Sequence, residues 1–406
     1  MLPALRSLAL AAAFAATACS APAQAAAPDA ARQAAVQAVL QAAVDKPEAA
    51  GAVGLVARRD GAPLVVCAGV RDLASKAPMT PDTIFQIASM TKPVTAVAVL
   101  MLEEEGRLSI DDPVEKHLPA FKGQLLLKEK TGDTVTLVKP PRPITLRDLL
   151  THTSGMPGDY PPGLADLYKR RHLSLAEAVL ANAQRPLQFE PGTKWSYCNA
   201  GIDTLGRVVE AVSGMPFETF LAERLFKPLG MTDTFFYITP ERRDRIARIY
   251  KVGKGSLEPV ENFIGEPVAG EARFPVPAGG LYSTAADYLA FGRMMLNGGL
   301  HAGRRILKAE TVAKMTTNGT GDLKAGFTPG MGMGLGFQVV VKPEGVTAML
   351  SPGTFGHGGA FGTQGWFDPV KGVAYVLMVQ RTGIPNGDAS DLRRAFQAAA
   401  AEAAAE

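Results

Sequence analysis

The pattern of hydrophobic and polar positions divides the chain into strand-forming ends and a helix-rich centre. Near the N-terminus, two runs rich in apolar residues, 52–58 and 63–70, flank Asp60-Gly61, a dipeptide typical of hairpin turns. Strand-like runs return at 336–341, 365–367 and 373–380. Helical patterns occupy 27–48, 91–105, 207–213, 216–226, 287–297 and 389–404. This order predicts an α/β (α+β) fold, in which one antiparallel sheet built from both chain ends is flanked by helices and a mainly helical region is inserted.

The helix predicted at 91–105 is apolar on all sides. Its sequence from Pro93 to Leu102 contains only one polar residue, and Gly106 offers a C-terminal cap. A helix without a polar face lies inside a large core. A lysine in its first turn is therefore not expected to be an ordinary solvated side chain. Further along, glycines at 330, 332, 334 and 336 would leave one strand face bare and let another backbone or a ligand approach closely.

Composition excludes several classes of function. The chain has 406 residues, with 42 Lys plus Arg against 39 Asp plus Glu, a net charge of +3, and 47% hydrophobic residues. Such a chain can bury a core and is not disordered, and it lacks the strong positive charge of a protein that binds nucleic acid by bulk electrostatics. Its 3 cysteines cannot form a disulfide scaffold. Cys67 and Cys198 are left either as a disulfide or as free thiols.

The first 25 residues are typical of a secretory signal peptide. One arginine is followed by a short apolar run, and Ala23-Gln24-Ala25 matches a cleavage site. We therefore expect an exported, periplasmic protein. Cys19 leaves a second possibility, an outer-membrane lipoprotein, although Ala16 is smaller than the aliphatic residue usual at that position of a lipoprotein signal. Membrane association is expected only in that case.

The motif Ser89-Met90-Thr91-Lys92 carries the strongest chemical signal. Residues i and i+3 share a helix face, so the hydroxyl of Ser89 and the amine of Lys92 are expected side by side at a helix N-terminus, where free N–H groups suit a developing oxyanion. A serine hydroxyl needs a base, and a desolvated lysine can be neutral and serve as one. The alternative, a helix cap plus a surface lysine, conflicts with the apolar helix that follows.

Two further motifs are weak alone. Tyr197-Cys198-Asn199 offers a phenol for proton transfer and an amide to hold a carbonyl. The run 356–360, GHGGA, offers glycines that allow close backbone approach to a substrate.

In this order and spacing, the three motifs resemble those of the serine-reactive β-lactamase and penicillin-binding superfamily. The resemblance is greatest to class C β-lactamases and family VIII carboxylesterases. It covers about residues 35–395 and includes supporting segments at 149–155, 189–192 and 279–284. After the signal peptide expected at 1–25, the chain is expected to form a sheet-plus-helix domain from 26–88 and 275–406 and a mainly helical region at 89–274, with the active site at their interface.

The resemblance also implies the role of each residue. Ser89 would attack an ester or amide carbonyl and become acylated. Lys92 and Tyr197 would handle protons as one unit, the lysine charge favouring tyrosinate; since both reference pKa values lie near ~10, the site must shift at least one. Asn199 would position the substrate or the lysine. Substrate binding and the oxyanion hole would involve His357, Gly358, Gly359 and Ala360, the hole being formed by the backbone N–H groups of Ser89 and Ala360.

His357 departs from the family pattern. A lysine usually begins this motif and provides a permanent cation for a substrate carboxylate, whereas a histidine is mostly neutral at neutral pH. We therefore expect weaker selection for β-lactams and peptide C-termini, and a preference for neutral esters or amides. The alternative is a hydrogen-bonded loop histidine that does not contact substrate.

Other candidates add little chemistry. No Gly-x-Ser-x-Gly elbow accompanies His152, so we expect it to tie down its loop through backbone contacts. Trp366 could line the pocket or pack in the sheet. The sequence has no metal-binding motif, and we expect neither metal nor cofactor.

The sequence thus predicts an exported serine hydrolase that forms an acyl-enzyme on Ser89 and cleaves carboxylic esters. One alternative is a β-lactamase, D,D-carboxypeptidase or D-aminopeptidase. Another, of a different class, is a catalytically silent binding or sensor protein on the same fold. The expected partner is a small-molecule ester, amide or β-lactam, and not nucleic acid.

Overall fold

The computed structural model describes residues 30–161 and 163–405, so the predicted signal peptide and Cys19 lie outside the described residues. Within them, eight strands form the main sheet in the order β12-β13-β14-β15-β16-β1-β2-β3. Their bounds are β1 Gly51–Arg58, β2 Leu64–Asp72, β3 Ala77–Pro78, β12 Met331–Met333, β13 Gln338–Val340, β14 Phe355–Gly358, β15 Gln364–Asp368 and β16 Val373–Val379.

The sheet joins the two ends of the chain, as predicted. β1 pairs antiparallel with β16 in an unbroken register that runs from Ala52 opposite Val379 to Arg58 opposite Val373. β1 and β2 form the expected hairpin on its other side. The ladders of this sheet are all antiparallel.

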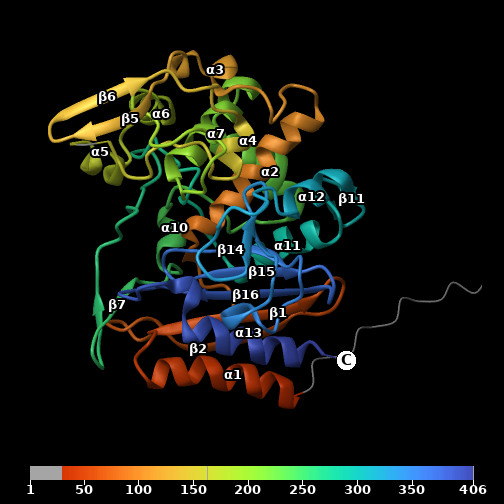
Figure 1. Ribbon diagram of the computed structural model, residues 1–406. Helices are drawn as coiled ribbons and strands as arrows, with labels where there is room; N and C mark the ends of the chain where they lie inside the picture. The colour runs from red at the N-terminus through yellow and green to blue at the C-terminus, as the bar shows by residue number, and fades with distance from the viewer. Residues whose placement is uncertain (1–29, 162, 406) are drawn as a thin grey trace, which may run out of the picture.

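Helices cover both faces of the sheet (Figure 1). α1 (Ala30–Asp45) and α13 (Asp391–Ala403) pack on each other beneath it. The other helices are α2 Thr91–Glu104, α3 Val114–His117, α4 Leu146–Leu150, α5 Ala165–Arg170, α6 Leu175–Ala183, α7 Asn199–Ser213, α8 Phe217–Leu221, α9 Lys227–Leu229, α10 Pro240–Arg243, α11 Ala285–Leu296 and α12 Ala309–Thr316.

Shorter strands complete the structure. The pairs are β4 Phe85–Gln86 with β9 Tyr282–Ser283, β5 Leu126–Thr131 with β6 Thr134–Val138, and β10 Leu300–His301 with β11 Arg304–Arg305. A further small sheet contains β7 Tyr250–Val252, β8 Leu257–Pro259 and β17 Arg381–Thr382. No helix among the described residues combines the length and the apolar character needed to cross a bilayer.

Each face of the main sheet buries its own hydrophobic core, because successive side chains of a strand point in opposite directions. From β1, Val53 and Leu55 enter the core shared with α2, α7 and α11. Ala52 and Val56 enter the second core, under α1 and α13. The active-site motifs lie on the first of these sides, where the inserted helices meet the sheet. The domain boundaries at 88–89 and 274–275 stay a prediction.

The apolar helix is α2, and its residues from Thr91 to Leu102 are all buried. One predicted glycine approach is also present: a Cβ on Gly336 would lie 2.4 Å from the Cβ of Ala96 in α2. The alternating glycines do not share one strand face, however, because β12 ends at Met333. Only glycine at position 336 lets the turn between β12 and β13 lie directly against α2.

The start of α7 differs from the prediction. The helix was expected from residue 207 but begins at Asn199. Cys198 caps it, since its sulfur accepts a hydrogen bond of 3.4 Å from the Gly201 amide. Cysteine is not among the residues that usually signal a helix start, which is why the pattern gave a late boundary.

Candidate active site

Ser89 lies in a tight 3₁₀ turn, Ala88–Met90, between β4 and α2. Ala88 has φ +46, in the left-handed region that non-glycine residues seldom adopt, and is fully buried. Hydrogen bonds on either side fix the turn: Thr91 Oγ1 donates to Ala88 O at 2.7 Å, and Ile87 N donates to Leu281 O at 3.0 Å. Such strain persists only where the surroundings enforce it, and here it presents the Ser89 hydroxyl at the end of α2.

The Ser89 hydroxyl is flanked by the two predicted proton carriers. Lys92 Nζ lies 3.0 Å from Ser89 Oγ, and the Tyr197 hydroxyl lies 2.7 Å from the same atom. The Lys92 amine also sits 4.6 Å from the centre of the Tyr197 ring. The structure therefore brings these three side chains into one hydrogen-bonded cluster, although Tyr197 is far from the others in sequence.

Lys92 is fully buried and has one fixed partner besides Ser89. Its Nζ donates to the carbonyl oxygen of Ala278 at 2.6 Å. Burial lowers the pKa of the Lys92 ammonium to about 7, against the opposing attraction of Asp203. Near neutral pH a substantial fraction of the amine is therefore uncharged. With one N–H held by Ala278, the free lone pair can face the Ser89 hydroxyl.

Tyr197 behaves differently from the expectation that the lysine charge favours tyrosinate. Desolvation raises the pKa of the Tyr197 phenol well above its ordinary value, and the hydrogen bond to Ser89 only partly offsets this. The phenol is therefore neutral and acts as a hydrogen-bond donor. Of the two groups, the one whose pKa is shifted towards neutral pH is Lys92, so the amine is the group that can be uncharged and basic near pH 7.

His152 holds the tyrosine loop in place. Its Nδ1 accepts a hydrogen bond of 3.2 Å from the Cys198 amide, and its ring centre lies 4.7 Å from that of Tyr197. Burial, with the Lys92 charge, lowers the pKa of His152 well below its ordinary value, so the ring is neutral. Because its Nδ1 lone pair is already engaged, His152 does not act as a base for Ser89. The expected backbone-tying role agrees with these contacts.

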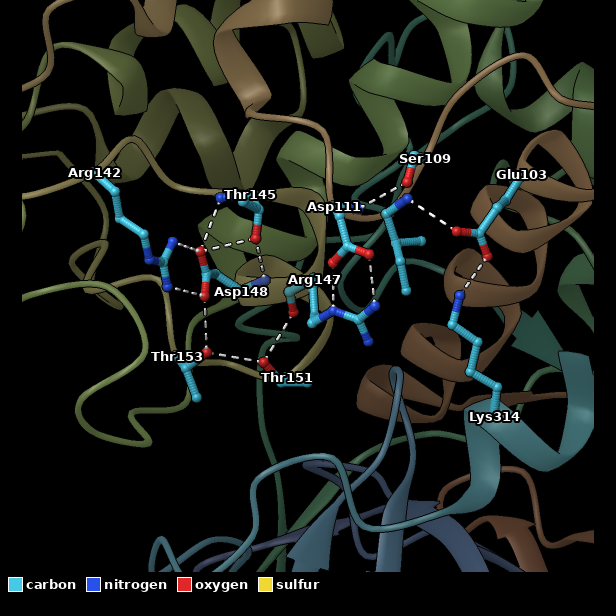
Figure 2. Close-up of polar contacts among 11 residues, drawn as sticks. Glu103, Ser109, Asp111, Arg142, Thr145, Arg147, Asp148, Thr151, Thr153 and Lys314 are labelled. Carbon is cyan, nitrogen blue, oxygen red and sulfur yellow. Dashed lines mark hydrogen bonds and ion pairs between the residues drawn. The ribbon is translucent and has the colours of Figure 1, made fainter.

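A polar network in turn fixes the segment that carries His152 (Figure 2). Thr145 and Asp148 form a capping box at the start of α4, and the Asp148 carboxylate accepts hydrogen bonds from the two terminal guanidinium nitrogens of Arg142, at 2.5 and 2.9 Å. Thr153 Oγ1 lies 2.9 Å from Thr151 Oγ1 just beyond. These bonds stabilise a chain reversal in which His152 has φ +57.

His357 lies on β14 and is buried. Its Nδ1 is 2.6 Å from the Gly358 carbonyl oxygen, which can only accept, so Nδ1 carries the ring hydrogen. Burial, followed by the Lys92 charge, lowers the pKa of His357 to about 4. The imidazole is therefore neutral, and the lone pair of its buried Nε2 has no partner among the described residues.

The end of β14 lies beside the nucleophile turn. A Cβ on Gly359 would come within 2.5 Å of the Ile87 carbonyl oxygen, so only glycine allows this approach. The next residue, Ala360, is exposed. In the described chain, no acceptor is found for the backbone N–H groups of Ser89 and Ala360. Both are thus available to an oxyanion.

Several candidate residues stand apart from this cluster. Asn199 is exposed in the first turn of α7 and makes no side-chain hydrogen bond within the described residues, while the lysine is held by Ala278 instead. Trp366 is fully buried on the opposite face of the sheet, against the guanidinium of Arg393, so it packs in the core and does not line the pocket. Cys67 and Cys198 are both free thiols.

Sequence reasoning missed two contributors. Ala278 supplies a backbone carbonyl, which no side-chain motif can reveal. Phe327 packs edge-on against the Tyr197 ring, with 4.8 Å between ring centres, and comes from a loop without a recognisable signal. In the part of the chain that the structure describes, no group of acidic, histidine or cysteine residues is placed to hold a metal ion.

The sequence profile of the Beta-lactamase family matches residues 36–400. Esterase EstB of Burkholderia gladioli is 31% identical over 364 residues, which cover 83% of this chain and 87% of that protein. A putative D-alanyl-D-alanine carboxypeptidase of Escherichia coli (strain K12) is 29% identical, over 76% of this chain and 71% of its own length.

Among solved structures, a similar one is that of EstCE1, described as a hydrolase with promiscuous acyltransferase activity. It superposes with a TM-score of 0.74 at 28% identity and covers 90% of this chain and 98% of its own. The profile match, these relatives and the Ser89–Lys92–Tyr197 cluster agree: the chain belongs to the Beta-lactamase family and is a serine hydrolase.

Proposed function

We propose that this protein hydrolyses neutral carboxylic esters through an acyl-enzyme on Ser89. The observation that carries the proposal is the Ser89 hydroxyl held between the Lys92 amine and the Tyr197 phenol, beside a neutral His357. The first two groups supply nucleophilic catalysis. The third lacks the positive charge that would select a substrate carboxylate.

The acylation step follows from the positions of these groups. Neutral Lys92 takes the proton of Ser89 as Oγ attacks the ester carbonyl carbon, and the backbone N–H groups of Ser89 and Ala360 stabilise the oxyanion. The tetrahedral intermediate then expels the alcohol, which receives a proton through the Tyr197 hydroxyl, and Tyr197 is reprotonated by Lys92. Water attacks the acyl carbonyl by the same route, releasing the acid and free Ser89.

The relatives support ester cleavage as the reaction but do not identify which ester this protein cleaves. EstB is an esterase by name, and EstCE1 is a hydrolase with acyltransferase activity. A second candidate, action on β-lactams or D-alanyl peptides, is supported by the relative described as a putative D-alanyl-D-alanine carboxypeptidase. Against it stands the His357 position, because both of those substrate classes carry a carboxylate and a neutral imidazole lone pair offers it no attraction.

Parallel assays separate the candidates. Short p-nitrophenyl esters, a chromogenic cephalosporin and a D-alanyl-D-alanine peptide are each supplied to the purified protein. The proposal expects kcat/KM to be highest for the esters. Much faster cephalosporin hydrolysis would favour the second candidate, and failure of all three, with no labelling of Ser89 by a fluorophosphonate, would favour a catalytically silent binding protein.

Substitution of His357 with lysine tests the substrate preference. The new ammonium would attract a carboxylate, so the ratio of kcat/KM for a carboxylate-bearing ester to that for its neutral methyl ester should rise by about tenfold or more. His357→Gln, which adds no charge, is the matched control and should leave the ratio within about threefold of the wild type. An unchanged ratio in His357→Lys would contradict the role given to this position.

Export from the cytoplasm is part of the proposal. It is supported by the arginine, apolar run and Ala-x-Ala site of residues 1–25. Expression with the native N-terminus should give a periplasmic protein that begins at residue 26, as measured by fractionation and N-terminal sequencing. A lipid-modified protein beginning at Cys19 would show the alternative, and an uncleaved cytoplasmic protein would contradict export.

A further inference from the structure

A buried carboxylate on α7 lies behind the catalytic lysine. Asp203 is only 4% exposed, and its Oδ1 accepts a hydrogen bond of 2.9 Å from the Ala278 amide. Ala278 is the residue whose carbonyl oxygen binds Lys92. The acylation steps above use the lysine and its carbonyl partner but give no task to Asp203.

The peptide group between Pro277 and Ala278 is held from two helices at once. Its carbonyl oxygen accepts a hydrogen bond of 2.7 Å from Thr95 Oγ1 on α2, and its N–H donates to Asp203 on α7. The following carbonyl then points at Lys92 Nζ, 2.6 Å away. Asp203 thus anchors the backbone unit that takes one N–H of the Lys92 amine and leaves its lone pair towards Ser89.

The loop that carries Ala278 requires such anchoring. Val276 has φ +56, an uncommon conformation for a β-branched residue, and therefore a strained one. α7 also packs closely against the loop, because a Cβ on Gly206 would lie 2.3 Å from Pro277 Cγ. The hydrogen bonds from this strained loop to α2 and α7 therefore help to hold its geometry.

Asp203 also acts on Lys92 through its charge. Its attraction favours the Lys92 ammonium and so opposes the burial that lowers the pKa of that group. Burial in turn raises the pKa of Asp203 to about 7, while its hydrogen bond with Ala278 and the charge of Lys92 oppose that rise. The two groups therefore titrate as a pair in the same pH range.

The other titratable groups around this pair are mostly neutral near pH 7. His152, His357 and Tyr197 have pKa values displaced towards their uncharged forms by burial. Burial likewise raises the pKa of the Cys198 thiol, to about 11. The remaining charges and phenols that interact with Asp203 come from the 160–171 segment: the buried guanidinium of Arg171 and the phenols of Tyr160 and Tyr168.

We propose that Asp203 is a positioning residue for Lys92, because Asp203 fixes Ala278 so that the amine lone pair faces Ser89. The negative charge of Asp203 also sets the pH at which the Lys92 amine becomes neutral. The inference rests on the proposed function in taking Lys92 as the base that activates Ser89. Asp203 itself does not touch the substrate or the reacting atoms.

The test is the pH dependence of Ser89 labelling by a fluorophosphonate, which reports nucleophile activation without requiring the natural substrate. In the wild type, the labelling rate constant should rise with pH through about 7, since neutral Lys92 is the active form. Asp203→Asn keeps an acceptor oxygen for Ala278 and removes the charge. This variant should move the rise in labelling rate to lower pH by about one unit, and its limiting rate should stay within about threefold of the wild-type limiting rate. Asp203→Ala removes both functions and should lower the limiting rate by about tenfold or more.

Asp287→Asn is the matched control. Asp287 on α11 is also a buried carboxylate that accepts a backbone hydrogen bond, 2.8 Å from the Asp233 amide, and it takes no part in the active site. Its variant should leave the pH profile unchanged. An Asp203→Asn profile that superimposes on the wild type, or an Asp203→Ala limiting rate equal to it, would overturn the inference. A wild type that resists labelling would instead contradict the proposed function, and the inference with it.

Discussion

Replacing Ser89 with alanine is expected to lower ester turnover by at least about four orders of magnitude. The hydroxyl is the only side-chain group of the residue that the mechanism uses, and it lies within hydrogen-bonding distance of the Lys92 amine and the Tyr197 phenol. No other group of the cluster can form the acyl-enzyme in its place. The loss should appear in kcat, measured with a p-nitrophenyl ester at saturating concentration.

The fold of the Ser89→Ala variant should remain intact. The side chain is half-buried and its turn is held by Thr91 and Leu281, so we expect a circular dichroism melting curve close to that of the wild type. Ser256→Ala, at an exposed serine in the turn between β7 and β8, is the control and should keep full activity. Esterase activity retained in Ser89→Ala would refute the acyl-enzyme mechanism.

Lys92→Met is expected to lower kcat/KM by about three orders of magnitude, because it removes the general base while keeping the length of the side chain. Stability should change little. Removing the buried amine removes its desolvation penalty, which stabilises the fold. The Ala278 carbonyl loses its hydrogen-bond donor, which destabilises the fold, so the two effects oppose one another. The melting temperature should therefore stay within about 5 °C of the wild type.

Lys194→Met provides the control for this substitution. Lys194 precedes Tyr197 on the same loop but is exposed, and its replacement should leave kcat/KM within about threefold of the wild type. The labelling rate with a fluorophosphonate should fall in Lys92→Met and not in Lys194→Met. Wild-type rates of ester hydrolysis and labelling in Lys92→Met would show that another group activates Ser89.

Local signals in the sequence were sufficient for the first hairpin, the buried helix and the nucleophile, but not for β3, β12 and β14. Asp60-Gly61 predicted the β1–β2 hairpin, and the wholly apolar run predicted the buried α2. The i, i+3 spacing placed the Lys92 amine beside the Ser89 hydroxyl, because residues three apart in a helical segment share a face. Each of these features depends on residues that are neighbours along the chain.

The parts that could not be predicted depend on contacts between distant segments. Lys92 and Ala278 are 186 positions apart, and the contact uses a backbone carbonyl that has no sequence signature. Burial disfavours the charged form of both groups, so it lowers the pKa of Lys92 and raises that of Tyr197, and only the packed structure reveals that both are buried. Asp203 was hidden for a further reason, since α7 begins earlier than its pattern indicated and the residue was not recognised as helical.

His152 and His357 illustrate the same limit. Both were noted from sequence, but the position of each ring hydrogen follows from a backbone contact, with the Cys198 amide in one case and the Gly358 carbonyl in the other. Their neutral charge follows from burial, which lowers both pKa values. These contacts make His152 a support for the tyrosine loop and leave His357 with an unpaired lone pair on Nε2.

Mass spectrometry of the acid-quenched protein tests the central claim most directly. The protein is mixed with a panel of p-nitrophenyl esters, a cephalosporin and a D-alanyl-D-alanine peptide, quenched within the first turnovers and digested. We predict a mass increase equal to the acyl group of the ester on the peptide that contains Ser89, absent in Ser89→Ala and more abundant than any adduct from the other two substrates. Ester hydrolysis without an adduct on Ser89, or an adduct on another residue that persists in Ser89→Ala, would contradict the account.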